Sequence, residues 1–151
     1  MTDTDLSTIR HFSRSEIEAS GGSVEGLSFA LFQKLDRLRD CFGRPLSLLS
    51  GGLNSGRHIS NTDVHAQGIA ADLVPIEPQG AADVTGMFRA FLDAGLHGFG
   101  AYWGSQGVRS YHVDDRPSYA LWLAVWDAAK GDWGYLPWTM TDPATLAGVK
   151  V

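Results

Sequence analysis

The chain has 151 residues, a net charge of −5 and an isoelectric point near 5.4. This length suits a single domain over residues 1–151, and the absence of a basic cluster argues against a nucleic-acid partner. No apolar stretch approaches about 20 residues, so we expect no membrane insertion, and the first residues lack a secretory signal pattern, so we expect a protein made in the cytoplasm. The one cysteine, Cys41, excludes an internal disulfide, and we expect it to be buried as a small apolar residue.

The first third of the chain predicts helices. Residues 1–10 are polar, and we expect them to be flexible. Ser13 and Glu16 have the spacing of a helix capping box, which predicts a short helix after Ser13. Apolar residues then recur at steps of three and four along residues 23–42, which predicts an amphipathic helix that ends at Gly43.

The middle of the chain predicts two strands and a second helix. Residues 45–50 form a short apolar run typical of a strand, and residues 51–65 are rich in Gly, Ser and Asn, which is typical of a loop. Residues 68–76 predict a strand that is buried on both faces apart from Asp72. Residues 82–94 predict an amphipathic helix that ends at the following glycine.

The last third predicts mainly extended structure. Residues 98–103 and 109–114 predict two strands joined by a turn at the sequence GSQG. Residues 119–126 fit a strand or a helix. The tail carries Trp133, Tyr135 and Trp138, and we expect it to pack across the core. The order of the elements favours an α+β domain with a small, mainly antiparallel sheet and flanking helices.

Asp72 stands out because it lies between Ala71 and Leu73 in an otherwise apolar strand. A buried carboxylate is costly unless a cation, a metal or several hydrogen-bond donors satisfy it. His65, at the end of the preceding loop, and His112, in a later predicted strand, could approach it. Two imidazoles and one carboxylate form a common ligand set for catalytic zinc, with the fourth position open. The spacing alone favours a simpler interpretation, in which backbone donors satisfy Asp72 and the two histidines are unrelated to it.

The residues around these three positions form a longer pattern. Residues 63–72 read DVHAQGIAAD, and residues 112–114 read HVD. This pattern resembles the Ser-x-His, Gly-x-Ala-x-Asp and His-x-Asp motifs of the metallopeptidase family of zinc D-alanyl-D-alanine carboxypeptidases, vancomycin-resistance D,D-dipeptidases and phage endolysins. The resemblance implies that His65, Asp72 and His112 bind one Zn²⁺ per chain.

Further segments match the family in the same order along the chain. HFSRSE at residues 11–16 resembles the opening of the carboxypeptidase branch, and LSLLSGG at residues 46–52 resembles the strand before its Ser-Gly-Tyr-Arg loop. GFGAY at residues 98–102 resembles its Gly-x-Gly-x-Tyr strand, and Trp122 falls where the branch usually has a tryptophan. The resemblance spans residues 11–122 and implies the Hedgehog/DD-peptidase-like fold.

Two functional positions of the family hold other residues in this chain. The arginine of Ser-Gly-Tyr-Arg aligns with Leu53, and Arg57 or His58 of the same loop is a candidate replacement in substrate binding. The general base of the family stands shortly before the last ligand, where this chain has Arg109 and Ser110. An arginine cannot accept a proton, so no residue fills the base position.

A further departure from the family pattern is Asp63, which replaces the serine that opens the zinc motif. Other nearby residues are candidates for supporting roles. Asp114 shares a strand face with His112, and could either orient that ligand or act catalytically on the water. Tyr102 and Trp103 are candidates for substrate binding because the corresponding family segment borders the groove, although both could instead fill the core.

The resemblance implies a zinc-dependent peptidoglycan peptidase that hydrolyses an amide bond next to a D-amino acid, with the cell-wall stem peptide as its partner. The missing signal pattern fits a phage or prophage enzyme that phage machinery releases or injects. The altered base and arginine positions leave two alternatives open. One is a relative that binds without cleaving, such as a structural part of a phage particle, and the other is an enzyme with a different amide substrate and a relocated base.

Overall fold

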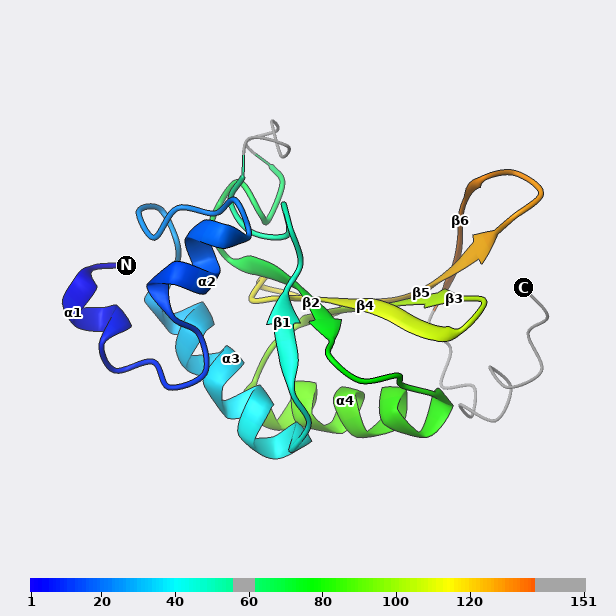
Figure 1. Cartoon of the computed structure of the whole chain (residues 1–151), viewed down its shortest axis with the longest axis horizontal. Helices are drawn as coiled ribbons and strands as arrows, with labels where there is room; N and C mark the ends of the chain where they lie inside the picture. The colour runs from blue at the N-terminus through cyan, green and yellow to red at the C-terminus, as the bar shows by residue number, and fades with distance from the viewer. Residues whose placement is uncertain (56–61, 138–151) are drawn as a thin grey trace.

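The fold is a mixed α+β domain built on one open sheet, in a computed structural model that describes residues 1–55 and 62–137. Six strands pair in the order β1-β2-β4-β3-β5-β6 (Figure 1). Neighbouring strands in these residues run antiparallel, except for the parallel pair β3 and β5. The structure therefore confirms the expected α+β class and the mainly antiparallel sheet.

The order of elements along the chain places helices first and most strands last. The helices are α1 (Asp3–Leu6), α2 (Arg14–Ala19), α3 (Phe29–Phe42) and α4 (Ala81–Ala94). The strands are β1 (Leu46–Leu48), β2 (Ala70–Pro75), β3 (Gly98–Gly104), β4 (Gly107–Asp114), β5 (Ala120–Asp127) and β6 (Asp132–Pro137). Within residues 1–55 and 62–137, no helix is long and apolar enough to cross a membrane.

The long helix α3 begins at Phe29, six residues later than the apolar spacing predicts. Gly26 has a φ of +81°, which a right-handed helix does not allow, and the Ser28 side chain then accepts a hydrogen bond from a backbone N–H of the first turn. Leu27 is still buried in the core, so the apolar period extends beyond the helix. The predicted end at Gly43 is confirmed by its left-handed φ of 69°.

The N-terminal segment, for which we expect flexibility, contacts α3. Within residues 1–10 the chain forms α1, and Leu6 is buried. The carboxylate of Asp36 in α3 accepts hydrogen bonds from the backbone N–H groups of Arg10 and His11 at 2.7 and 3.0 Å. The expected burial of Cys41 is wrong, because this residue lies on the exposed side of α3.

The C-terminal strands differ from the prediction mainly in β6. The hairpin between β3 and β4 is confirmed, and the segment that could be strand or helix is the strand β5. The part of the tail that the structure describes, up to residue 137, does not pack across the core, since β6 pairs with the edge of β5 and leaves Tyr135 62% exposed. Trp138 lies outside the described residues.

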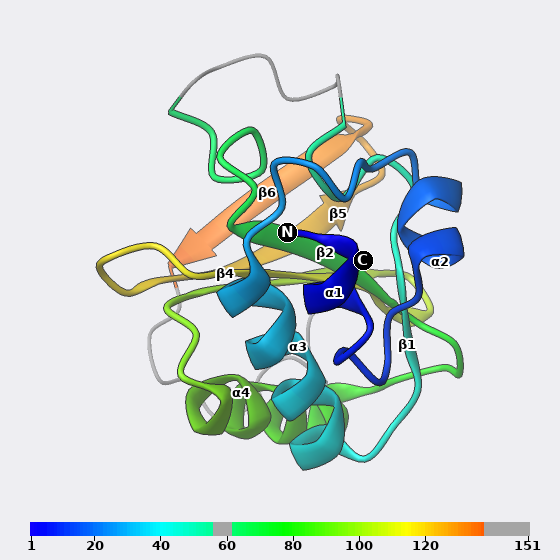
Figure 2. The same cartoon turned by 90° about the vertical axis from the view of Figure 1, so that its left-hand side faces the viewer.

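The two faces of the sheet have different surroundings. Helices α3 and α4 lie on one side, and the loop that leads into β2 rises on the other (Figures 1 and 2). On the helix side, Phe99 of β3 packs against Phe91 of α4 and Tyr111 of β4, with ring centroids 5.2 and 5.9 Å apart. Neither α3 nor α4 covers the opposite face, which carries the polar residues Asp72 of β2 and His112 and Asp114 of β4.

Two glycines of β3 make room on that polar face. A Cβ atom on Gly98 would lie 2.0 Å from the carboxylate of Asp114, and a Cβ atom on Gly100 would lie 2.3 Å from the Trp122 ring. Both distances are far inside van der Waals contact. The side chains of β4 and β5 therefore lie across β3, which requires glycine at these two positions.

We predict that Gly98→Ala destabilises the protein by about 1–3 kcal/mol, because the new methyl group overlaps a fully buried carboxylate. The matched control is Gly86→Ala in α4, where a Cβ atom meets Phe42 at an ordinary 3.6 Å. That change should be neutral or stabilise by up to about 1 kcal/mol, since alanine favours a helix over glycine. Urea unfolding measures both, and equal effects of the two substitutions would contradict the packing described for β3.

Candidate metal centre

The strand register brings Asp72 and His112 together. Asp72 of β2 lies directly opposite His112 of β4, so the two side chains point to the same face. On its other side, the backbone N–H of Asp72 donates to the carbonyl oxygen of Gly52 at 2.8 Å, and its carbonyl oxygen accepts from Leu49 at 2.9 Å. The backbone of Asp72 is thus held on both sides, and its side chain is directed at His112.

A tight loop positions His65 above this pair. The carboxylate of Asp63 accepts a hydrogen bond from the backbone N–H of His65 at 2.8 Å. Gly68 has a φ of +70°, and a Cβ atom there would lie 1.8 Å from the carbonyl oxygen of Gly26. The carbonyl oxygen of Gly68 also accepts from the N–H of Ser28 at 2.9 Å. The loop therefore docks on the start of α3, and only glycine fits at the contact.

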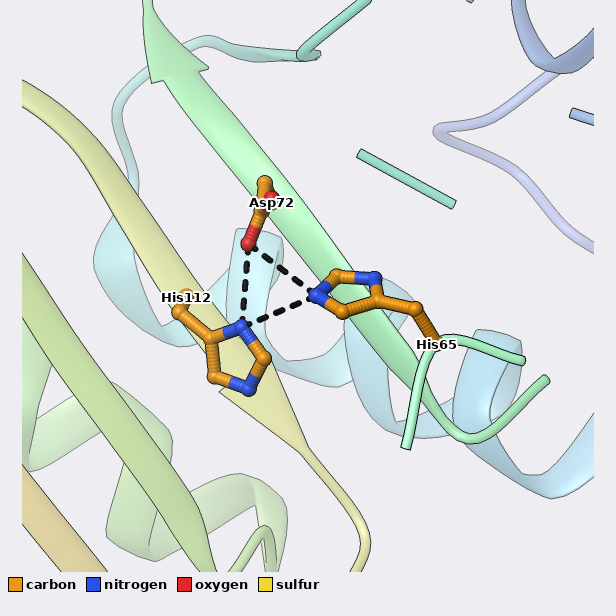
Figure 3. Close-up of side chains that lie close together, drawn as sticks. All are labelled: His65, Asp72 and His112. Atoms are coloured by element: carbon orange, nitrogen blue, oxygen red, sulfur yellow. Dashed lines mark hydrogen bonds and ion pairs between the residues drawn. The ribbon is translucent and has the colours of Figure 1, made fainter. Parts of the chain in front are cut away.

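The three side chains converge on one point (Figure 3). His65 Nε2 lies 3.1 Å from His112 Nδ1, His112 Nδ1 lies 3.0 Å from Asp72 Oδ1, and His65 Nε2 lies 3.5 Å from Asp72 Oδ1. Ligands about 2.0–2.1 Å from a tetrahedral zinc ion lie about 3.3 Å from one another. The separations of the three atoms therefore match those of ligands that share one small cation.

The three candidate ligands line an open hollow of about 430 Å³, which we call the metal hollow. It is lined by Thr62, Asp63, Val64, His65, Asp72, Tyr102, His112, Arg116 and Trp122. The side chains of His65 and His112 are 6% and 7% exposed, and that of Asp72 is 15% exposed. A cation held by these atoms would thus keep a coordination position open toward the hollow, as catalytic zinc sites do.

Charge interactions within the site favour an ionised Asp72 and a protonated His112. Burial alone would raise the pKa of Asp72, but hydrogen bonds from His112 and His65 lower it well below its usual range. Burial opposes the charged form of His112, but hydrogen bonds to Asp114 and Asp72 outweigh it and raise the pKa of His112. The proton on His112 faces Asp72, where a bound cation would replace it.

Asp114 supports His112 from behind. Its Oδ2 atom accepts a hydrogen bond from His112 Nε2 at 2.8 Å, which leaves Nδ1 directed at the metal position. Both carboxylate oxygens also accept from the Arg116 guanidinium, at 2.7 and 2.9 Å from its Nε atom. The side chain of Asp114 is completely buried. Burial would raise its pKa, but His112 and Arg116 lower it, so Asp114 stays ionised. This arrangement suits orientation of the ligand rather than contact with a substrate.

Trp122 closes the side of the metal hollow. His112, Gly100 and Trp122 occupy one row across β4, β3 and β5. Because Gly100 has no side chain, the Trp122 ring lies over it and approaches His112 with ring centroids 5.0 Å apart. The Arg116 guanidinium lies 5.8 Å from the Trp122 ring. The ligand His112 is therefore enclosed by a carboxylate, a cation and an aromatic ring.

Other residues singled out in the sequence are placed differently. Tyr102 lines the metal hollow, whereas its neighbour Trp103 points to the opposite face and belongs to the hydrophobic core. Leu53, at the position of the family arginine, is fully buried, so its side chain does not reach the site. Arg57 and His58 lie outside the described residues.

Arg116 is a site residue that the sequence reading missed. It lines the metal hollow and pairs with the buried carboxylate of Asp114. The sequence did contain a signal for it. The strand pattern places Asp114 on the same face as His112, and Arg116 follows Asp114 by two residues. A carboxylate buried in this way requires a cationic partner, and the nearest arginine in the sequence supplies it.

Comparisons of the chain with protein-family models, with curated proteins and with solved structures found no match. The site is therefore interpreted from its own geometry. A cluster of two histidines and one aspartate whose ligand atoms lie within 4.8 Å of one another can hold a metal ion.

We predict that Asp114→Asn weakens zinc binding about 10- to 100-fold, because the amide orients His112 less firmly and leaves Arg116 without its anion. Asp115→Asn is the matched control, because Asp115 pairs with Lys34 rather than with the site. A competition titration with a chromogenic chelator measures both affinities. If the two variants bind zinc equally well, Asp114 does not support the metal position.

We also predict that the gain in melting temperature on adding zinc increases from pH 6 to pH 8. His112 has a folded-state pKa above its usual 6.5, so its protonated form stabilises the metal-free protein below pH 6.5. As the pH rises through this raised pKa, His112 loses its proton and the metal-free protein loses that stabilisation. A zinc ion then no longer has to displace a proton from His112, so zinc binding stabilises the protein more. Thermal unfolding with and without zinc at each pH tests this, and a gain that is constant or falls over the range would contradict it.

Proposed function

We propose that this protein is a zinc-dependent peptidase that hydrolyses an amide bond next to a D-amino acid in the stem peptide of peptidoglycan. The observation that carries the proposal is the convergence of His65, Asp72 and His112 in the lining of an open hollow, at separations that suit zinc. A zinc ion there would supply Lewis-acid polarisation of a carbonyl group and a water that is more easily deprotonated. The remaining steps fall to the chain's own residues.

Asp63 is our candidate for the general base. Among the described residues that line the metal hollow, it is the one carboxylate besides the ligand Asp72. Its turn directly precedes His65, so the carboxylate is anchored beside the metal position. In the proposed reaction Asp63 takes a proton from the attacking water, whose oxygen bonds to the carbonyl carbon. The proton then passes to the amide nitrogen as the carbon–nitrogen bond breaks.

Tyr102 is our candidate donor to the carbonyl oxygen, in place of the arginine that Leu53 replaces. Burial raises the pKa of Tyr102 to about 12, so its hydroxyl group stays protonated near neutral pH. It can therefore donate a hydrogen bond but cannot act as a base. Arg116 also lines the metal hollow, but its guanidinium is engaged by Asp114.

The resemblance of residues 63–72 and 112–114 to the family motifs supports the peptide substrate and the choice of zinc over other divalent ions. The residues at the family base and arginine positions support the second candidate function, a relative that binds metal without cleaving. Both candidates require the metal, and they differ in the fate of the substrate. Release or injection by phage machinery would bring either protein to the cell wall.

We predict that the zinc-loaded protein releases new amino groups from purified peptidoglycan, and that His65→Ala loses both the zinc and the cleavage. His11→Ala is the matched control, because His11 pairs with Asp40 far from the metal hollow and should leave both intact. Stoichiometric zinc without any cleavage by the wild-type protein would contradict the peptidase and favour the binding module.

Asp63→Asn tests the base within the same assay. The asparagine oxygen can still accept the hydrogen bond from His65, so the loop and the zinc content should be retained. The cleavage rate should fall about 10²- to 10⁴-fold, as expected when a general base is removed. A rate close to that of the wild-type protein would show that the base lies elsewhere.

A further inference from the structure

A β-bulge directs Arg109 onto the polar face of the sheet. Tyr102 of β3 pairs with Ser110, but the next residue, Trp103, pairs with Val108, so Arg109 is an extra residue in β4. A bulge of this kind breaks the alternation of side chains and redirects one of them. The stem of Arg109 lies over Gly104, where a Cβ atom would approach its Cδ atom to 2.7 Å.

Arg109 lines a second groove, which we call the arginine groove, with a volume of about 570 Å³. Its wall includes Arg109, Ser110, Trp133 and Tyr135, and it shares Asp72 and Tyr102 with the metal hollow. Because two residues line both cavities, the arginine groove adjoins the metal position. A ligand that extends from the metal hollow along β4 would enter it.

Within the described residues, none of the ion pairs involves Arg109. Its guanidinium instead lies 5.8 Å from the centroid of the Trp133 ring, and Trp133 contacts Tyr102 edge to face at 5.2 Å. An arginine on an aromatic ring is held in place while its N–H groups stay available for a planar anion. Carboxylate and phosphate both fit this fork, and carboxylate is the one that a peptide substrate carries.

We infer that the arginine groove is a binding site for a carboxylate group of the substrate, with Arg109 as the residue that selects it. This inference rests on the proposed peptidase function, and it assigns a role to the residue at the position of the family base. Arg109 lies three residues from His112 along β4, which is roughly 7–10 Å at the rise of a strand because Arg109 is the extra residue of the bulge. An extended peptide covers that length in about two or three residues. The selected carboxylate therefore belongs to a peptide unit about two or three residues from the bond that is cut.

A set of synthetic stem peptides tests the site, each with one carboxyl group replaced by a carboxamide. With the zinc-loaded wild-type protein, one of these replacements should lower kcat/KM about tenfold, mainly by raising KM, because it removes a charge-assisted hydrogen bond. Arg109→Gln should lose the preference for that carboxylate, mainly through a higher KM, while its zinc content stays unchanged. Arg109→Lys should keep part of the preference, since it keeps the charge but not the fork.

Arg89→Gln is the matched control. Arg89 is exposed on α4, on the other side of the sheet, and its replacement should leave the wild-type preference intact. If Arg109→Gln remains as sensitive to every replacement as the wild-type protein, the inference is overturned. If the wild-type protein cleaves no peptide, the peptidase proposal fails by itself. The same comparison is then made on binding, followed by tryptophan fluorescence, where loss of discrimination in Arg109→Gln supports the carboxylate site and unchanged discrimination rejects it.

Discussion

The structure depends on one cross-strand pair, the carboxylate of Asp72 facing the imidazole of His112. Both side chains are largely removed from water, and neither would be stable there alone. The pair is possible because β2 and β4 are adjacent and antiparallel in a register that sets these two residues opposite each other. His65 completes the cluster from a loop whose shape depends on Gly68. Everything that makes the site chemically useful follows from holding these three polar groups together.

Around this pair, the sheet provides successive layers of support. Asp114 fixes the outer nitrogen of His112, and Arg116 neutralises Asp114, so each buried charge has a partner of the opposite sign. Gly98 and Gly100 leave the space in which these side chains lie. Helices α3 and α4 lie on the other face, and among the described residues the polar face borders the metal hollow (Figure 1). The division of the sheet into a packed face and a face that borders the metal hollow is therefore the link between fold and proposed function.

The local sequence pattern singled out Asp72 and His112, whereas the family resemblance selected the full set of candidate ligands, His65, Asp72 and His112. Asp72 interrupts an apolar strand, His112 alternates with apolar neighbours, and both strands were predicted close to their observed positions. The convergence itself depends on strand order, which the local pattern does not encode. The β3 strand gives a simple example: Tyr102 and Trp103 are neighbours in an extended strand, so only one of them can face the groove.

Features that depend on irregular geometry could not be predicted. The bulge at Arg109 adds a residue to β4, and an alternation of polar and apolar residues cannot show where a strand carries such an insertion. The start of α3 was placed too early because Leu27 contributes to the core from outside the helix. The strand β6 was missed because its exposed Tyr135 and Leu136, together with Gly134, lack the alternation of a half-buried strand.

The zinc-edge X-ray absorption spectrum of protein loaded with one equivalent of zinc tests the shared metal site most directly. The account predicts nitrogen and oxygen ligands at about 2.0–2.1 Å, outer-shell scattering from two imidazole rings, and no sulfur. A sulfur ligand near 2.3 Å would place the metal at the exposed Cys41, and a shell of oxygens without imidazole would place it on surface carboxylates. Either spectrum would contradict the assignment of the metal to His65, Asp72 and His112.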